Sequence, residues 1–391
     1  MENDDKIKIV EWLLFFYLIL FPFGQIIRWQ LTFGEISFAL HPTDAVVVMI
    51  FLCTLAFGLT KPRVFKLAEN FLLAASFSLI LSIFIFRSGL VVLGAFYLLR
   101  IYAYSYLFVA AWNIFRGEKL KETLLTSLIG ISLAMAVFGW FQYFVYPDFR
   151  PLVEWGWDDH LYRLVSTLLD PAFTSIILVF GYVLSLTKYL VSQKRGYLGL
   201  AIFFLITTAF TYSRAGYLAI VVGSVAVLLA FKKLKKVLIL IFGLLLIVFL
   251  LPRPSGEGVK LERLRSIYAR GTNYLETLKI ASKAPLFGVG FNNLCLARQQ
   301  YLGRADARSH ACSGSDSSLL FILATTGIIG LVIFLTGLYQ VVKFLPKDIY
   351  GISALGAVAG LGIHGFFSNS YFYPWVMGYM ALLLALGINR N

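Results

Sequence analysis

The stretch YLGLAIFFLITTAFTYSRAGYLAIVVGSVAVLLAF, residues 197–231, decides the fold class of this chain. It is almost entirely apolar, and as a single helix its 35 residues would be about 52 Å long at ~1.5 Å per residue. A bilayer has a hydrocarbon core only about 30 Å thick, which about 20 residues of helix can cross. The stretch therefore predicts two membrane spans joined by a tight turn at residues 213–216, at or slightly below the membrane surface.

Similar apolar runs recur along the rest of the chain. Of its 391 residues, 59% are hydrophobic and only 14% are Asp, Glu, Lys or Arg, whereas a soluble protein has about 25% charged residues. This composition argues against a soluble enzyme, a disordered chain and a nucleic-acid-binding module. We expect an all-α polytopic membrane protein with about twelve transmembrane helices, at residues 11–27, 44–60, 69–87, 89–115, 122–146, 171–190, 197–212, 215–231, 237–252, 317–343, 350–367 and 371–389.

The basic residues between these runs predict the orientation. If the N-terminus is cytoplasmic, 18 of the 34 Lys and Arg residues fall in cytoplasmic segments, and only five fall in the short outer loops. Cytoplasmic loops of membrane proteins carry such an excess of Lys and Arg. The pattern therefore predicts that both termini are cytoplasmic.

One long outer segment, residues 253–315, divides the chain into helices 1–9 (1–252), a loop, and helices 10–12 (316–391). This loop contains ten basic and four acidic residues, and long loops do not follow the orientation rule. Its residues 260–282 show helical apolar spacing, which predicts two amphipathic helices divided at Gly271, lying on the membrane surface. A further helix is expected at 292–301.

Three arginines outside the ordinary topology signals are candidates for function. Arg214 lies in the turn at headgroup depth, where a guanidinium is costly unless it is paired or lines a wet cavity. Arginine binds phosphate oxygens through two parallel hydrogen bonds, so a phosphate-binding role fits Arg214 better than snorkelling. Arg163 lies in an outer segment and Arg100 in the middle of a span. For Arg163 and Arg100 the sequence is compatible with a functional role and with a structural role.

Among the histidines, His310 has the most polar surroundings, since serines and Asp316 lie close to it in the sequence. This neighbourhood is suitable for a general base. His364, inside the eleventh span, is a candidate for a supporting role. Asp158-Asp159-His160 could indicate a metal site, but three adjacent residues cannot easily surround one ion. We expect a solvated turn there, and no metal.

Two further features concern local structure. Asp170-Pro171 is a typical helix start, with Asp as the N-cap and Pro at the first helical position. Cys295 and Cys312, 17 positions apart in the outer loop, could form a disulfide in an oxidising compartment or remain free thiols.

Three motifs give the chain a resemblance to a known family. They are Thr211–Gly216 in a span hairpin, Arg270 followed by Pro285–Phe291, and Asp316–Leu320 running to Gly327–Gly330. With twelve spans and one large outer loop, their order resembles the O-antigen ligase/polymerase superfamily of bacterial envelope glycosyltransferases. The resemblance covers most of the chain.

The resemblance implies an enzyme that transfers a glycan from undecaprenyl diphosphate to an acceptor hydroxyl of a glycolipid, glycan or protein. The reaction would take place on the outer face of the bacterial inner membrane, without a metal or other cofactor. Arginines of the family hold the diphosphate, and Arg214 and Arg270 match their positions; the segment containing Arg163 also resembles the family. Where the family has a histidine at the start of the tenth span, this chain has Asp316, our first choice as base, with His310 second.

Two other functions compete with glycan transfer. Twelve spans would also suit a transporter, which typically has internal repeats and ionisable groups near the midplane. Here only Arg100 looks central, and no repeat is apparent. A non-catalytic protein that binds anionic membrane lipid is the third reading, and it would tolerate lysine in place of Arg214 and Arg270.

Overall fold

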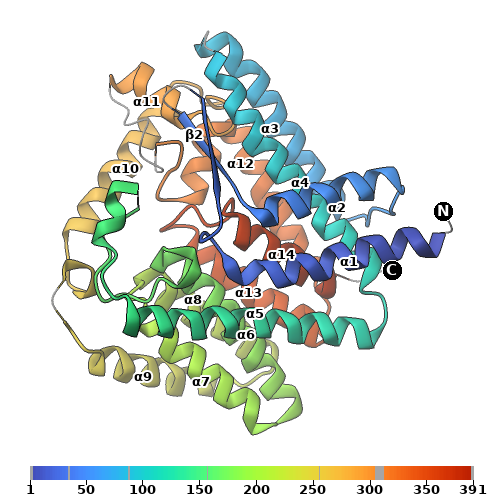
Figure 1. Ribbon diagram of the computed structural model, residues 1–391, viewed down its shortest axis with the longest axis vertical. Coiled ribbons are helices and arrows are strands. Elements are labelled where there is room, and N and C mark those ends of the chain that lie inside the picture. The colour runs from blue at the N-terminus through green and yellow to red at the C-terminus, as the bar shows by residue number, and fades with distance from the viewer. Residues whose placement is uncertain are drawn as a thin grey trace.

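The computed structural model describes residues 3–33, 36–86, 89–155, 157–254, 256–303 and 312–388. Nearly all of its regular structure is helical (Figure 1). The α-helices are α1 (Asn3–Leu20), α2 (Pro42–Ala56), α3 (Phe65–Phe86), α4 (Val92–Ile114), α5 (Glu118–Val145), α6 (Pro171–Ser192), α7 (Arg195–Ala209), α8 (Arg214–Ala230), α9 (Lys235–Leu250), α10 (Arg265–Ala281), α11 (Leu294–Leu302), α12 (Ser318–Phe344), α13 (Ile349–His364) and α14 (Pro374–Gly387). Short 3-10 turns are η1 (Phe21–Phe23), η2 (Gly89–Val91), η3 (Arg150–Trp155), η4 (Ser166–Leu168) and η5 (Glu257–Val259).

Each of the twelve predicted spans overlaps one of these helices, α1–α9 and α12–α14, with several boundaries displaced. Five helical segments of the described chain are long and apolar enough to cross a membrane, namely α3, η2 with α4, α5, α6 and α12. Five others, α2, α7, α8, α13 and α14, are apolar but have only 14–17 residues. The chain is thus a helical membrane protein, and twelve spans remain a prediction.

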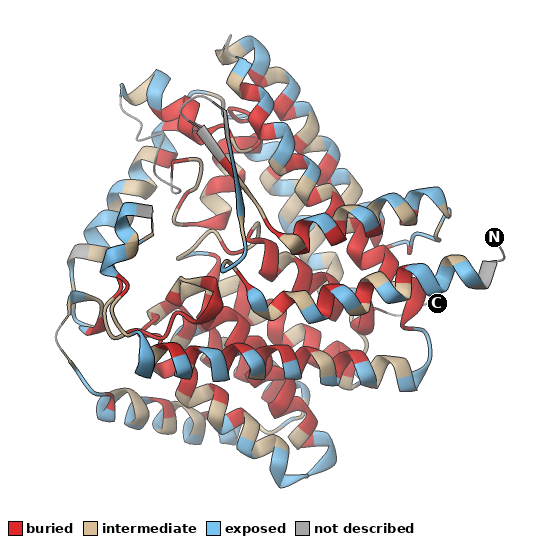
Figure 2. Cartoon of the chain, viewed as in Figure 1, coloured by how far each residue is buried: buried red, intermediate tan, exposed pale blue. Residues whose placement is uncertain are grey.

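Helices α5, α7, α8, α13 and α14 pack against α6, which is the most deeply buried of the five long apolar helices of the described chain. Buried residues fill the middle of the bundle, whereas α9 at its edge is largely exposed (Figure 2). On α9, Leu238, Phe242 and Phe249 are 69–77% exposed. Water would make such a surface unfavourable, so it is suited to contact with lipid.

Residues 29–40 depart from the all-α prediction. Strands β1 (Trp29–Phe33) and β2 (Ile36–Leu40) pair antiparallel, with Trp29 opposite Leu40 and Leu31 opposite Phe38. In β1, apolar Trp29, Leu31 and Phe33 alternate with polar residues, the period-2 pattern of a strand. The all-α prediction is wrong for this hairpin, because it weighed long apolar runs and treated the segment as a loop.

The outer loop departs from the prediction in one helix. Instead of two helices divided at Gly271, α10 runs without interruption from Arg265 to Ala281. A lone glycine costs a helix only about 1 kcal/mol relative to alanine, too little to break it. Arg270, the residue before the expected division, therefore lies within a continuous helix. The helix expected at 292–301 is confirmed as α11.

The second and third motifs of the sequence meet at a break in α12. Gly327 interrupts that helix with φ +69°, and Gly288 in the facing loop has φ +73°, conformations that favour glycine. A Cβ at Gly327 would come within 2.2 Å of the Leu286 carbonyl oxygen. Backbone hydrogen bonds from Val289 N to Ala324 O (2.9 Å) and from Ile328 N to Pro285 O (2.9 Å) join the two segments. The glycines thus allow the middle of the outer loop to pack closely against α12.

Candidate functional site

The turn between α7 and α8 positions Arg214. The two predicted helices are confirmed, but the turn occupies residues 210–213 and Arg214 opens α8. Ser213 is the N-cap, and its Oγ accepts a hydrogen bond from Gly216 N at 3.2 Å. A Cβ at Gly216 would lie 2.6 Å from the Ser175 side chain on α6. The Ser-Arg-Ala-Gly sequence therefore lets α8 approach α6 closely and directs Arg214 outward from its first turn.

Neutral groups hold the Arg214 guanidinium. Nη2 donates to Ser266 Oγ at 2.7 Å, and Nη1 donates to the carbonyls of Leu261 (3.3 Å) and Arg263 (3.4 Å). Ser266 and Arg270 are four residues apart on α10, so they share one face of that helix. Within the described ranges, the Arg270 guanidinium makes no hydrogen bond or ion pair.

Two further arginines are fixed by carbonyls of the same turn. Arg163, only 9% exposed, donates from Nε to Thr211 O at 3.0 Å and from Nη2 to Tyr212 O at 3.4 Å. Arg263 donates to Tyr212 O at 3.5 Å and to Gly258 O at 2.6 Å. Arg263 is one of the ten basic residues of the outer loop, and it was not predicted to lie at this site. The spacing of seven residues between Arg263 and Arg270, about two helical turns, could have indicated that they lie on the same side of the loop.

These four arginines surround a cavity of about 200 Å³. The lining residues are Asp158, His160, Arg163, Asp170, Pro171, Ala172, Ser213, Arg214, Arg263, Ser266 and Arg270. In the described part of the chain, none of the four arginines forms an ion pair with a carboxylate. Their excess over the two aspartates therefore leaves a positive cavity, as an anion-binding site requires.

The pKa shifts report the same crowding of positive charge. Burial and the nearby charge of Arg263 lower the pKa of Arg163 to about 9, which still leaves it charged at pH 7. Burial, with the charges of Arg214 and Arg270, also lowers the pKa of Arg263. An anion in the cavity would relieve this repulsion.

Asp316 lies close to the cavity, where α10 contacts the start of α12. Asn273 Oδ1 accepts hydrogen bonds from Asp316 N (2.9 Å) and Ser315 Oγ (3.1 Å), and Tyr274 OH donates to Phe366 O at 2.6 Å. Burial raises the pKa of the Asp316 carboxyl. The charge of Arg270 opposes that shift and the charge of Asp158 adds to it. The pKa of Asp316 thus reflects the charges around the cavity. His310 lies outside the described residues.

His364 contacts residues behind the cavity wall. It is fully buried; its Nδ1 lies 2.6 Å from Ser370 Oγ and its Nε2 lies 3.4 Å from Ser175 Oγ. Ser175 Oγ in turn donates to Ser213 Oγ at 3.1 Å. Through this chain of contacts His364 orients the N-cap that precedes Arg214, although it does not line the cavity.

Residues 158–170 carried two predictions, a solvated turn at residues 158–160 and a helix N-cap at Asp170. His160 is only 6% exposed, and Asp170 joins Asp158 and His160 from ten residues downstream. The predicted solvated turn is therefore wrong for His160, because sequence adjacency did not reveal the third side chain. The predicted N-cap is confirmed: Asp170 Oδ1 accepts from Ala172 N (2.7 Å) and Phe173 N (2.9 Å).

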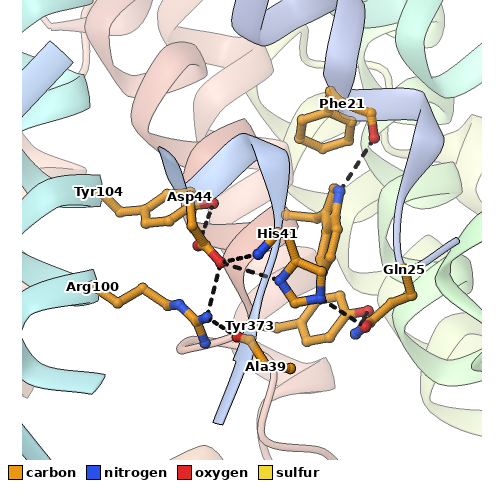
Figure 3. Close-up of polar contacts among 9 residues, drawn as sticks. Phe21, Gln25, Ala39, His41, Asp44, Arg100, Tyr104 and Tyr373 are labelled. Carbon is orange, nitrogen blue, oxygen red and sulfur yellow. Dashed lines mark hydrogen bonds and ion pairs between the residues drawn. The ribbon is translucent and has the colours of Figure 1, made fainter. Parts of the chain in front are cut away.

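Arg100 belongs to a separate buried cluster (Figure 3). Its Nη2 lies 2.8 Å from Asp44 Oδ2 and also donates to the Ala39 carbonyl of the hairpin. Asp44 Oδ2 is 3.1 Å from His41 Nδ1, and Tyr104 OH donates to Asp44 Oδ1 at 3.2 Å. This cluster joins β2, α2 and α4, so Arg100 ties the hairpin to the bundle.

A disulfide between Cys295 and Cys312 constrains the outer loop. It links α11 to the segment just before α12. Arg298 of α11 also donates to the Cys312 carbonyl. Both contacts hold the loop against the helix that follows Asp316.

With this geometry in place, comparison with known proteins identifies the domain. Residues 199–335 match the family model described as O-antigen ligase. Over these residues the chain is similar to the O-antigen ligase family. The match contains Arg214, Arg263, Arg270 and Asp316, whereas Arg163 and His364 lie outside it. No curated protein matches the chain in sequence. This match supports a broad function of the ligase and polymerase type.

Proposed function

We propose that this protein is an O-antigen ligase-like glycosyltransferase. It transfers a glycan from undecaprenyl diphosphate to an acceptor hydroxyl at the periplasmic face of the bacterial inner membrane, with both termini in the cytoplasm. The observation that carries the proposal is the cavity of four arginines without a carboxylate partner in the described chain. A diphosphate has the charge and the oxygen atoms that such a cavity can bind.

The arginines have two tasks in this reaction. Before transfer, Arg214 and Arg270 bind the diphosphate, and Arg163 and Arg263 add positive charge. During transfer the bond between the anomeric carbon and the phosphate oxygen breaks, so negative charge grows on the leaving diphosphate. Guanidinium groups already held by carbonyls and a hydroxyl stabilise that charge without large reorganisation.

Asp316 is our proposed general base. As the acceptor oxygen attacks the anomeric carbon, its proton passes to the Asp316 carboxylate, and undecaprenyl diphosphate leaves. Asp316 occupies the place of the family histidine, and its pKa responds to Arg270 and Asp158. His310 is the second candidate for this role.

Two relatives of this activity share the same donor chemistry. An O-antigen or exopolysaccharide polymerase would transfer the glycan to another glycan, and a protein O-oligosaccharyltransferase would transfer it to a serine or threonine hydroxyl. The cavity accounts for the donor diphosphate in each case, so the acceptor distinguishes the three.

A transporter is less well supported than a transferase. The residue that favoured it was Arg100, the basic residue in the middle of a span. Arg100 is paired with Asp44 and ties the hairpin to the bundle. The unneutralised arginines instead gather where α8, α10 and the segment before α6 meet.

The proposal is tested by deleting the gene in its host and complementing with variants. Arg214→Ala and Asp316→Ala should fail to restore the surface glycans. Arg253→Ala is the matched control, since this loop arginine is 3.6 Å from Glu262 and does not line the cavity. A wild-type glycan profile with both site variants would refute the assigned roles.

The deletion phenotype also identifies the acceptor. Single-repeat glycans would indicate a polymerase, and polymerised glycan left on the lipid carrier would indicate a ligase. Glycoproteins that lose their glycan would indicate the protein-modifying enzyme. Restoration by Arg214→Lys with Arg270→Lys would instead favour diffuse binding of anionic lipid.

A further inference from the structure

Three side chains on the wall of the arginine cavity converge in a way that anion binding does not explain. The nearest ligand atoms of Asp158, His160 and Asp170 all lie within 4.8 Å of one another. They come from the segment before η4 and from the N-cap of α6, and all three line the cavity. This set offers one imidazole nitrogen and two carboxylates.

His160 is the independent sign that something binds there. Its side chain is 6% exposed, yet in the described chain neither ring nitrogen has a hydrogen-bond partner. A buried polar group without a partner costs about 1–3 kcal/mol. The backbone holds the residue in place, because Phe149 N donates to His160 O at 2.8 Å. A ligand would give the imidazole the partner that the protein does not supply.

The two aspartates retain free ligand atoms. Asp170 uses Oδ1 to cap α6, which leaves Oδ2 available. Asp158 is exposed and can rotate. Ligands about 2.1 Å from one tetrahedral ion are ~3.4 Å apart, so closure requires the ligand atoms to approach one another by up to about 1.4 Å.

We propose that Asp158, His160 and Asp170 form a binding site for a divalent transition-metal cation such as Mn²⁺ or Zn²⁺. Imidazole together with carboxylates is suited to these ions rather than to Ca²⁺ or Mg²⁺, which prefer oxygen ligands alone. The cation would lie beside the arginines. It is an addition to the four guanidinium groups and leaves their role in the proposed function unchanged.

The four cavity arginines should weaken cation binding at this site. Arg163, Arg214, Arg263 and Arg270 repel a cation in the same cavity. Removing the charge of Arg270, which has no partner in the described chain and is no ligand, should therefore tighten cation binding several-fold. A site elsewhere on the surface would not respond in this way.

The test is a titration of the purified full-length protein in detergent with Mn²⁺ alone, followed by electron paramagnetic resonance. We expect one Mn²⁺ per chain in the wild type, and at least about tenfold weaker binding in Asp158→Asn and His160→Gln. Asp170→Asn should weaken binding while its amide oxygen still caps α6. Asp159→Asn is the matched control, because this neighbour is exposed and does not line the cavity.

Equal Mn²⁺ affinity in the wild type and in Asp158→Asn would overturn the proposal, and so would loss of binding in the Asp159→Asn control. Asp158 is exposed, so its substitution should not prevent folding. The titration contains no glycan or lipid donor. Failure of the cation site is therefore distinguishable from failure of the proposed glycan transfer.

Discussion

Two arginine clusters in this protein differ in how their charge is balanced. Around Arg100, the Asp44 carboxylate accepts from the guanidinium and from Tyr104, and His41 lies beside it (Figure 3). Around the cavity, Arg163, Arg214 and Arg263 are held by carbonyls and a hydroxyl. The first cluster is neutralised within the protein, whereas the second retains its positive charge.

This difference in charge balance distinguishes arginines that stabilise the fold from arginines that can bind a ligand. A buried ion pair such as Arg100–Asp44 holds elements together, and breaking it mainly affects stability. Guanidinium groups without a carboxylate are stabilised by an anion from outside, and removing them mainly affects binding. Four predictions test this contrast, beginning with the largest effect.

Removing Arg214 and Arg270 together should reduce glycan transfer at least about 10³-fold, because each contributes to the charge stabilisation of the leaving diphosphate. Thermal unfolding in detergent should change little, since neither forms an ion pair in the described chain. The measurement is transfer from a lipid-linked donor by purified protein, with Arg253→Ala as control. Transfer at the wild-type rate by the double variant would show that the cavity arginines are not needed for binding the donor.

Asp44→Ala should have the opposite profile. It leaves Arg100 buried without its carboxylate, which costs about 3–5 kcal/mol of stability. A lower midpoint of thermal unfolding in detergent is the expected result. The double variant Asp44→Leu with Arg100→Met should recover much of this loss, because it removes both charges. If Asp44→Ala unfolded at the same temperature as the wild type, the Arg100 cluster would not stabilise the packing of the hairpin against the bundle.

Asp316→Asn should lower the transfer rate about 10²-fold, as loss of a general base does. The base must be deprotonated, and burial raises the pKa of Asp316. The wild-type rate should therefore fall as the pH decreases through that raised pKa, at a higher pH than for an ordinary carboxylate. A pH–rate profile checks this. An unchanged acidic limb in Asp316→Asn, with its loss in His310→Ala, would transfer the role to His310.

Gly216→Ala should have the smallest effect. Its methyl group would lie 2.6 Å from Ser175, so α8 must move away from α6 at a cost of about 1–3 kcal/mol. Both unfolding temperature and transfer rate should fall, because the same approach positions Arg214. Gly199→Ala in α7 is the matched control, since no neighbouring atom lies within 4 Å of its Cβ position. Equal behaviour of the two variants would show that the close approach is not required.

Local signals predicted much of the fold. Apolar runs located the twelve helices of the bundle, and Asp170-Pro171 located a helix start. The β1–β2 hairpin was missed because its alternation is short, and the α10 helix was divided because a lone glycine was given too much weight. These errors arise where a weak local pattern competes with packing that the sequence does not display.

The sequence by itself determined that the chain is apolar and helical, and it singled out Arg214, Arg270 and Asp316, because periodicity and motif spacing are local properties. Only the tertiary structure decided that Arg163 and Arg263 join Arg214 and Arg270 around one cavity and that Arg100 does not. It also brought Asp170 beside His160. The physical reason is that charge balance depends on which side chains meet in space, and those contacts join residues far apart in the chain.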